Sequence, residues 1–118
     1  MKKRVYIIYT GGTIGMVQTR KGYAPQQGYL GKKLDVIEAL KAEIMPEYVL
    51  QEYTPLLDSS NISLKEWSQI AKDIELNYHE YDGFVVFHGT DTMAYTASAL
   101  SFMLEGLGKP VILTGAQI

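Results

Sequence analysis

The 118-residue sequence contains no cysteine, and this absence excludes several kinds of site. Without thiols the chain cannot form a disulfide, a zinc ribbon or an iron–sulfur cluster, and it cannot use a cysteine nucleophile. Positive charge is also not in excess, since eleven Lys and Arg stand against thirteen Asp and Glu, giving a net charge of −2. Such a chain has no electropositive field for a nucleic-acid backbone, so no nucleic-acid partner is expected.

Long hydrophobic runs are missing as well. The apolar run after the basic residues 2–4 is about five residues long, whereas a secretory signal needs roughly 7 to 15 apolar residues and a membrane span roughly 20. We therefore expect no membrane partner, a cytoplasmic location and a natural N-terminus at or close to Met1. Hydrophobic residues still make up 47% of the chain, which is typical of an ordinary folded domain.

Four short segments predict β-strands, because they are rich in β-branched and aromatic residues. The first, third and fourth are apolar throughout, which is typical of strands that are covered by helices on both faces. The predicted strands are residues 5–9, 48–53, 83–88 and 110–114.

Three helices are predicted between these strands. Apolar residues at helical spacing indicate a helix over residues 34–44 that ends before Pro46. Ser63 and Glu66 form a capping-box pattern at the start of a second helix. Residues 92–104 are apolar nearly all round, so the third helix is expected to be well buried. The predicted apolar face of the second helix consists of Leu64, Trp67, Ile70, Ala71, Ile74 and Tyr78.

Strands that alternate with helices predict an α/β fold, with a parallel sheet of βα units and helices on both faces. In open parallel sheets, ligands bind beyond the carboxyl ends of the strands. The four segments at those ends are rich in glycine and hydroxyl groups, which suit the orientation of a small polar substrate. They read TGGTIG at 10–15, TPLLDSSN at 54–61, HGTDT at 88–92 and TGAQ at 114–117.

Each segment also has a simpler structural interpretation. Gly11 and Gly12 can form the tight turn of a hairpin. Residues 58–60 can make turn and cap hydrogen bonds before the second helix. Either Thr90 or Asp91 can serve as the N-cap of the third helix, although a cap does not need both.

Metal and cofactor sites find little support in the sequence. His88, at a strand end, is more typical of a hydrogen-bonded structural histidine than of a catalyst, and no ligand spacing relates it to Asp58 or Asp91. Thr10 stands where a dinucleotide fingerprint needs its first glycine. We therefore expect no metal and no cofactor.

Two segments are highly specific in combination. YTGGTIGM at 9–16 and YDGFVVFHGTDTMAYTASALSFML at 81–104 strongly resemble the two signature segments of the bacterial L-asparaginase family. DSSN at 58–61 and GKPVILTGAQ at 108–117 fit the same pattern in order. The resemblance covers the whole chain, and the missing cysteines and signal segment favour the cytoplasmic type I branch over the secreted one.

The resemblance implies an amidohydrolase that converts L-asparagine into L-aspartate and ammonia through a threonine acyl-enzyme. Thr13 corresponds to the nucleophile, and Tyr23 corresponds to a tyrosine that contacts it from a mobile loop. Thr90 matches the second catalytic threonine, and Asp91 matches the carboxylate that meets the α-ammonium group of the substrate.

The other substrate contacts that the resemblance implies lie in the second and fourth segments. Ser59 and Ser60 match the positions that hold the substrate α-carboxylate, although secreted enzymes typically have Gln at the second position. Asp58 is expected to contribute through its backbone, and Ala116 is expected to line the pocket.

The same resemblance implies that residues 1–118 are the N-terminal part of the N-terminal α/β domain of a longer two-domain enzyme, which is a homodimer or homotetramer. The catalytic lysine of the family lies beyond the GAQ segment, and Lys109 is expected at the wrong end of the sheet to replace it. The chain alone is then inactive and exposes apolar surface. A non-catalytic amino-acid-binding domain is the alternative function, and a nucleotide or phosphate site at the first turn is a third.

Overall fold

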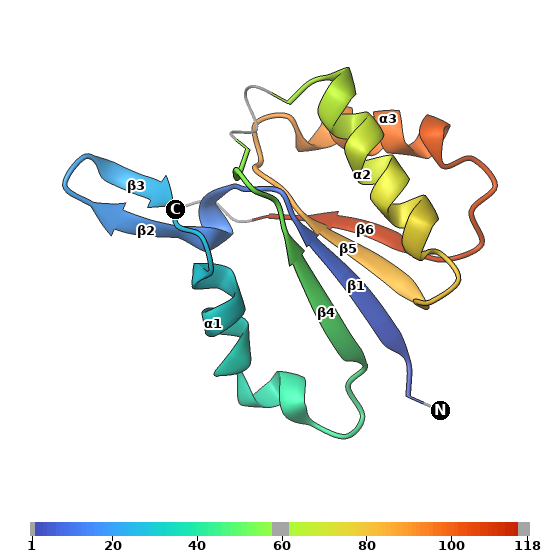
Figure 1. Ribbon diagram of the computed structural model, residues 1–118, viewed down its shortest axis with the longest axis horizontal. Helices are drawn as coiled ribbons and strands as arrows, with labels where there is room; N and C mark the ends of the chain where they lie inside the picture. Colours follow the sequence, from blue (N-terminus) through green and yellow to red (C-terminus); the bar gives the residue numbers. More distant parts are fainter. Residues whose placement is uncertain (1, 58–61, 116–118) are drawn as a thin grey trace.

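The computed structural model describes residues 2–57 and 62–115, which form a four-stranded parallel sheet with helices on both faces (Figure 1). The strands are β1 (Arg4–Tyr9), β4 (Glu47–Glu52), β5 (Gly83–Phe87) and β6 (Val111–Thr114), and their order in the sheet is β4-β1-β5-β6. The helices are α1 (Tyr29–Asp35), α2 (Leu64–Asn77) and α3 (Met93–Met103). The predicted α/β fold is confirmed, and the four predicted strands shift by at most one residue at either end.

Two separate apolar clusters hold the helices to the two faces of the sheet. Ile8 of β1 and Val86 of β5 are fully buried in the larger cluster, beneath α2 and α3. Tyr9, the next residue along β1, points to the other face and packs with Leu30 and Leu34 of α1. Because successive side chains of a strand alternate between faces, burial on both sides explains why β1 is apolar throughout.

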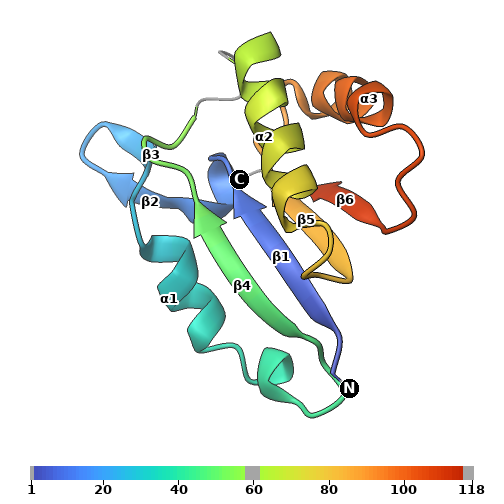
Figure 2. The ribbon, with the colours of Figure 1, turned by 45° about the vertical axis from the view of Figure 1, so that its right-hand side comes forward.

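The strand order creates a topological switch point between β1 and β5. From β1 the chain crosses through α1 to β4, and from β4 it passes back over β1 through α2 to β5 (Figure 2). The chain leaves β1 toward α1 on one face of the sheet and leaves β5 toward α3 on the other face, so a crevice lies between the loops that follow these two strands. The crevice between such loops is where open α/β sheets bind ligands.

The helix predicted over residues 34–44 is wrong in position, because α1 ends at Asp35. Ile44, which belongs to the predicted apolar stripe, is 92% exposed. The helix starts earlier than predicted because Gly28 adopts a left-handed conformation with φ 79° at its N-cap. The backbone N–H of Gly28 donates to the carboxylate of Glu52 at 2.9 Å, which ties the start of α1 to the end of β4.

Helix α2 begins as predicted, with Ser63 at its N-cap. The Glu66 carboxylate accepts a hydrogen bond from the Ser63 backbone N–H at 3.0 Å, and its bond with the Ser63 hydroxyl is the largest cause of its lowered pKa. Leu64, which was expected on the apolar face, is instead 65% exposed. The buried positions of α2 are Ile70, Ala71 and Ile74.

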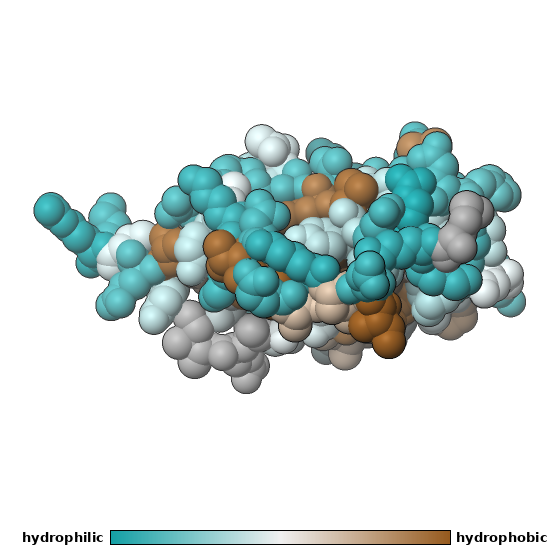
Figure 3. Space-filling view, turned by 90° about the horizontal axis from the view of Figure 1, so that it is seen from below, coloured by the Kyte–Doolittle hydropathy of each residue, from teal (hydrophilic) through white to brown (hydrophobic). Residues whose placement is uncertain are grey.

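Helix α3 is less buried than the sequence predicts. Only Thr96 and Leu100 are buried within it, whereas Tyr95 and Phe102 are 68% and 81% exposed. The face seen from below carries further apolar patches among hydrophilic residues (Figure 3). The chain therefore exposes apolar side chains, and the expectation that they contact the rest of a longer enzyme stays a prediction. In the part of the chain that the structure describes, no helix is both long and apolar enough to cross a membrane.

An antiparallel hairpin that the sequence did not predict connects the first turn to α1. A 3₁₀ turn, η1 (Thr13–Gly15), leads into β2 (Met16–Thr19) and β3 (Gly22–Pro25), and a second 3₁₀ turn, η2 (Glu38–Lys41), follows α1. The hairpin projects beyond the sheet (Figures 1 and 2). The alternative of a hairpin turn at Gly11 and Gly12 is wrong, because β1 pairs in parallel with β4 and β5 instead of folding back.

Candidate functional site

The loops that follow β1 and β5 meet at the switch point and enclose a cleft of about 90 Å³, called the site cleft below. Three residues that the sequence singled out, Thr13, Thr90 and Asp91, come from these two loops. Open α/β sheets bind ligands at this place. The residues that line the cleft are Gly12, Thr13, Met16, Leu57, Gly89, Thr90 and Asp91.

Hydrogen bonds extend the sheet into both loops. Thr10 donates to the Phe87 carbonyl oxygen twice, from its backbone N–H at 3.1 Å and from its hydroxyl at 2.9 Å. The Leu57 N–H donates to the Thr10 carbonyl oxygen at 2.6 Å. On the other side, the His88 N–H donates to the Thr114 carbonyl oxygen at 2.9 Å. The floor of the site cleft is therefore a continuation of the sheet.

Gly12 allows the two loops to touch. Its φ is 101°, a region that favours glycine, and a Cβ at this position would lie 2.7 Å from the Gly89 nitrogen and 2.8 Å from the Gly89 Cα. Both atoms belong to backbone, so a side chain here cannot be accommodated by a rotamer change. The absence of a side chain at Gly12 therefore brings the loop that carries Thr13 against the loop that carries Thr90.

A buried tyrosine supports the turn that carries Thr13. Tyr9 is fully buried, and its hydroxyl donates to the Gly12 carbonyl oxygen at 3.2 Å. A Cβ on Gly15 would lie 1.9 Å from the Tyr9 hydroxyl oxygen, so the turn closes directly over the ring. Burial, and then the charge of Glu52, raises the pKa of Tyr9 to about 12. The phenol therefore stays protonated and serves as a donor and not as a base.

Thr90 and Asp91 lie in the short segment before α3. Thr90 is half-buried and Asp91 is exposed at the rim of the site cleft. The N-cap of α3 is Thr92, so the expectation that Thr90 or Asp91 caps this helix is wrong by one or two positions. Both residues therefore precede the capped helix, whose first backbone N–H groups carry partial positive charge.

Among the described residues, one further predicted site residue, Tyr23, is not part of the site cleft lining. Tyr23 lies on β3 opposite Gln18 and is 51% exposed. Asp58, Ser59, Ser60 and Ala116 lie outside the described residues, so their predicted contacts with substrate stay predictions.

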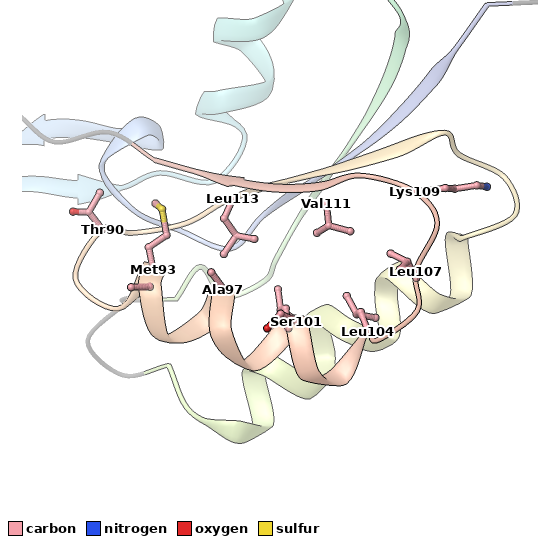
Figure 4. A pocket seen from close by; sticks show the side chains of 11 residues that line it. Thr90, Met93, Ala97, Ser101, Leu104, Leu107, Lys109, Val111 and Leu113 are labelled. Carbon is pink, nitrogen blue, oxygen red and sulfur yellow. The ribbon is translucent and has the colours of Figure 1, made fainter.

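A larger hollow of about 660 Å³, called the α3–β6 groove below, lies between α3 and β6 (Figure 4). Its lining is apolar except for Thr90, Ser101 and Lys109. Thr90 and Lys109 lie at opposite ends of the groove (Figure 4). The Lys109 ammonium donates to the Tyr78 carbonyl oxygen and lies 4.4 Å from the centre of the Tyr78 ring. This places Lys109 away from Thr90, as expected for a residue at the other end of the sheet.

His88 is a fully buried, hydrogen-bonded residue at the end of β5. Its Nδ1 lies 2.5 Å from the Gly89 carbonyl oxygen, and its Nε2 lies 2.9 Å from the Thr96 hydroxyl oxygen. Burial lowers the pKa of His88 below its ordinary value of 6.5. Within residues 2–57 and 62–115, no group of three or more His, Asp or Glu side chains is arranged to hold a metal ion.

The lowered pKa of His88 predicts a stability that falls in acid. Between the folded and unfolded pKa values the unfolded state binds more protons, so the contribution of His88 is complete above about 6.5 and is lost as the pH falls through the folded pKa. The free energy of unfolding, measured with urea from pH 7 downward, is expected to depend less on pH in His88→Gln than in the wild type. His79→Gln, at an exposed histidine, is the matched control. Equal slopes for His88→Gln and the wild type would contradict the prediction.

Comparison with known proteins gives the chain a family. A family model described as "Asparaginase, N-terminal" matches residues 4–118. The chain is 56% identical over 117 residues to L-asparaginase 1 of Escherichia coli strain K12, an alignment that covers 99% of this chain and 35% of that protein. It is also 45% identical over 137 residues to the 60 kDa lysophospholipase of Mus musculus, covering 99% of this chain and 24% of that protein.

A solved structure agrees with these sequence matches. The crystal structure of L-asparaginase I from Vibrio cholerae superimposes with a TM-score of 0.91 at 52% identity, covering 100% of this chain and 35% of that one. The chain therefore spans about a third of the length of its bacterial relatives. The family model for the N-terminal part of asparaginases matches nearly every residue, and the fold agrees at high identity. The chain therefore belongs to the asparaginase family.

Proposed function

We propose that this chain is the N-terminal part of an L-asparaginase, which hydrolyses L-asparagine to L-aspartate and ammonia. The observation that carries the proposal is the site cleft, where Thr13, Thr90 and Asp91 from two loops line one small hollow at the switch point. Two hydroxyl groups beside a carboxylate suit a small zwitterionic amide. L-asparaginases among the relatives support the same substrate class.

Thr13 is the proposed nucleophile. Its hydroxyl oxygen bonds to the side-chain amide carbon of asparagine, the C–N bond breaks, and the nitrogen takes up a proton and leaves as ammonia. Water then cleaves the resulting ester, which restores the Thr13 hydroxyl and releases aspartate. A threonine hydroxyl needs a base, and Tyr9 cannot supply one because its pKa is raised to about 12. Tyr23 is the residue proposed to contact Thr13, and a catalytic lysine outside this chain is proposed to pair with Thr90 and Asp91.

Thr90 and Asp91 are the proposed second half of the machinery. Asp91 is exposed at the rim of the site cleft, and its carboxylate is proposed to receive the substrate α-ammonium group. Thr90 orients the attacking water beside the positively polarised start of α3. Ser59 and Ser60 hold the substrate α-carboxylate, with Asp58 contributing through its backbone and Ala116 lining the pocket.

The β2–β3 hairpin is proposed to close over the bound substrate. Tyr23 lies on β3 with half of its surface exposed, so closure of the hairpin would bring its phenol from solvent toward Thr13. Closing segments of this kind exclude water and complete a site when substrate binds.

Residues 1–118 are proposed to be part of a larger N-terminal domain within a cytoplasmic, homo-oligomeric enzyme of type I that needs neither metal nor cofactor. The α3–β6 groove supports a larger domain, because its mainly apolar lining offers a surface on which further protein can pack. The chain alone is then inactive. The competing function is a domain that binds an amino acid without chemistry.

Covalent labelling tests the proposal. The full-length protein that contains this chain is incubated with an asparagine analogue that has an electrophilic carbon at the amide position, and its peptides are weighed. A mass gain on the peptide that carries Thr13 is expected, whereas a mere binding domain would gain no mass. The isolated chain is expected to release no ammonia from asparagine. Because one relative is named a lysophospholipase, fatty-acid release is assayed in parallel and is expected to be absent.

A further inference from the structure

A buried chain of hydrogen bonds runs from α2 through α3 to the loop that carries Thr90. The Trp67 indole N–H donates to the Thr96 hydroxyl oxygen at 2.8 Å. The same oxygen lies 2.9 Å from His88 Nε2, and His88 Nδ1 lies 2.5 Å from the Gly89 carbonyl oxygen. Thr96 and His88 are both fully buried. We call this set, Trp67, Thr96 and His88, the loop network.

The chemistry of these groups fixes the direction of every bond. An indole N–H can only donate and a carbonyl oxygen can only accept, so His88 Nδ1 carries a proton. In a neutral imidazole Nε2 then accepts, which requires the Thr96 hydroxyl to donate to it while accepting from Trp67. Burial, which lowers the pKa of His88, favours this neutral ring. Each group thus has a single role, and the network has one proton arrangement.

The loop network ends where the loop is most constrained. Gly89 receives the imidazole bond at its carbonyl oxygen, and its nitrogen and Cα lie against Gly12 on the other side. His88 is further confined because its own carbonyl oxygen would lie 2.2 Å from a Cβ on Gly115. The residue that follows Gly89 is Thr90, which lines the site cleft. A change at the network therefore reaches Thr90 through one peptide unit.

The polar nature of this network calls for a reason beyond stability. Burying two polar side chains costs free energy that their hydrogen bonds at best recover, and apolar residues of similar size would fill the space without that cost. Satisfied buried networks differ from an apolar core in that they specify one geometry. No member of the network lines the site cleft, so none of them touches the substrate.

We propose that Trp67, Thr96 and His88 are positioning residues that hold the Gly89 carbonyl and thereby set the position of Thr90 for catalysis. This inference rests on the proposed function, in which Thr90 acts on the bound substrate.

The test uses Thr96→Val in the full-length protein, since valine keeps the shape and removes the hydroxyl. Loss of both bonds is expected to lower kcat for asparagine hydrolysis about 10- to 100-fold, as small misplacements of a catalytic group do, with a much smaller change in KM. Thr96→Ser restores the hydroxyl and is expected to recover most of kcat. The ¹⁵N shifts of the His88 imidazole are expected to show a proton on Nδ1 in the wild type.

Two controls separate the possible failures. Ile74→Ala, in the buried core of α2, is expected to cost at least as much stability as Thr96→Val but to leave kcat unchanged well below its melting temperature. An unchanged kcat in Thr96→Val, no rescue by serine, or a proton on Nε2 overturns the positioning role. Full activity of Thr13→Ala would instead overturn the proposed function. The ¹⁵N shifts of the His88 imidazole report on the loop network alone, so they test the hydrogen bonds whatever the result for Thr13→Ala.

Discussion

Replacement of Thr13 by alanine in the full-length protein is expected to lower kcat for asparagine hydrolysis by about 10⁶-fold, the scale on which loss of a covalent nucleophile acts. Without the hydroxyl oxygen no ester can form, so the remaining rate comes only from binding and polarisation in the site cleft. The change is small in volume and Thr13 is only half-buried, so folding is expected to survive. Ammonia release under saturating asparagine measures the effect.

Matched variants make this result specific. Thr13→Ser keeps a hydroxyl at the same position and is expected to retain a measurable rate. Ser98→Ala removes a hydroxyl from the exposed side of α3 and is expected to leave kcat unchanged. If Thr13→Ala kept the wild-type rate, the nucleophile would lie elsewhere and the acyl-enzyme proposed for Thr13 would be wrong.

The sequence predicted the two central strands well because β1 and β5 have buried residues on both faces. Residues 5–9 and 83–88 are apolar at every position or nearly so, and only a central parallel strand satisfies both faces at once. Helix boundaries were harder to predict. The stripe over residues 34–44 has helical spacing, but α1 is set by Gly28 and its bond to Glu52, which is a tertiary contact without a local signal.

The candidate site could be predicted only in part, for a similar reason. The rule about carboxyl ends singled out the segments that carry Thr13 and Thr90, and the resemblance to the asparaginase family then pointed to these two residues within them. That they line one cleft depends on the strand order, which places β1 beside β5. The support under the cleft gave no signal at all. Tyr9 reads in the sequence as one more strand residue, and the pairing of Trp67 with Thr96 joins two helices far apart in the chain.

The second large effect is expected from Gly12→Ala. The new methyl group would meet the Gly89 backbone at 2.7 and 2.8 Å, so the two loops must separate. We expect a loss of about 4 kcal/mol or more in the free energy of unfolding, because steric overlap adds to an unfavourable φ. The separation also moves Thr13 away from Thr90, and displacements near 1 Å lower rates about 100-fold. Urea unfolding and ammonia release measure the two effects.

Gly22→Ala is an unusually close control for this variant. The φ of Gly22 is 104°, against 101° at Gly12, so both substitutions force alanine to nearly the same unfavourable φ. At Gly22, however, a new Cβ meets nothing within 4 Å. Gly22→Ala should therefore lose only the free energy of unfolding that the unfavourable backbone conformation costs, about 1–3 kcal/mol. The additional loss in Gly12→Ala then measures the contact between the two loops. Equal losses of stability in the two variants would mean that the loops do not touch, and the shared cleft for Thr13 and Thr90 would lose its structural basis.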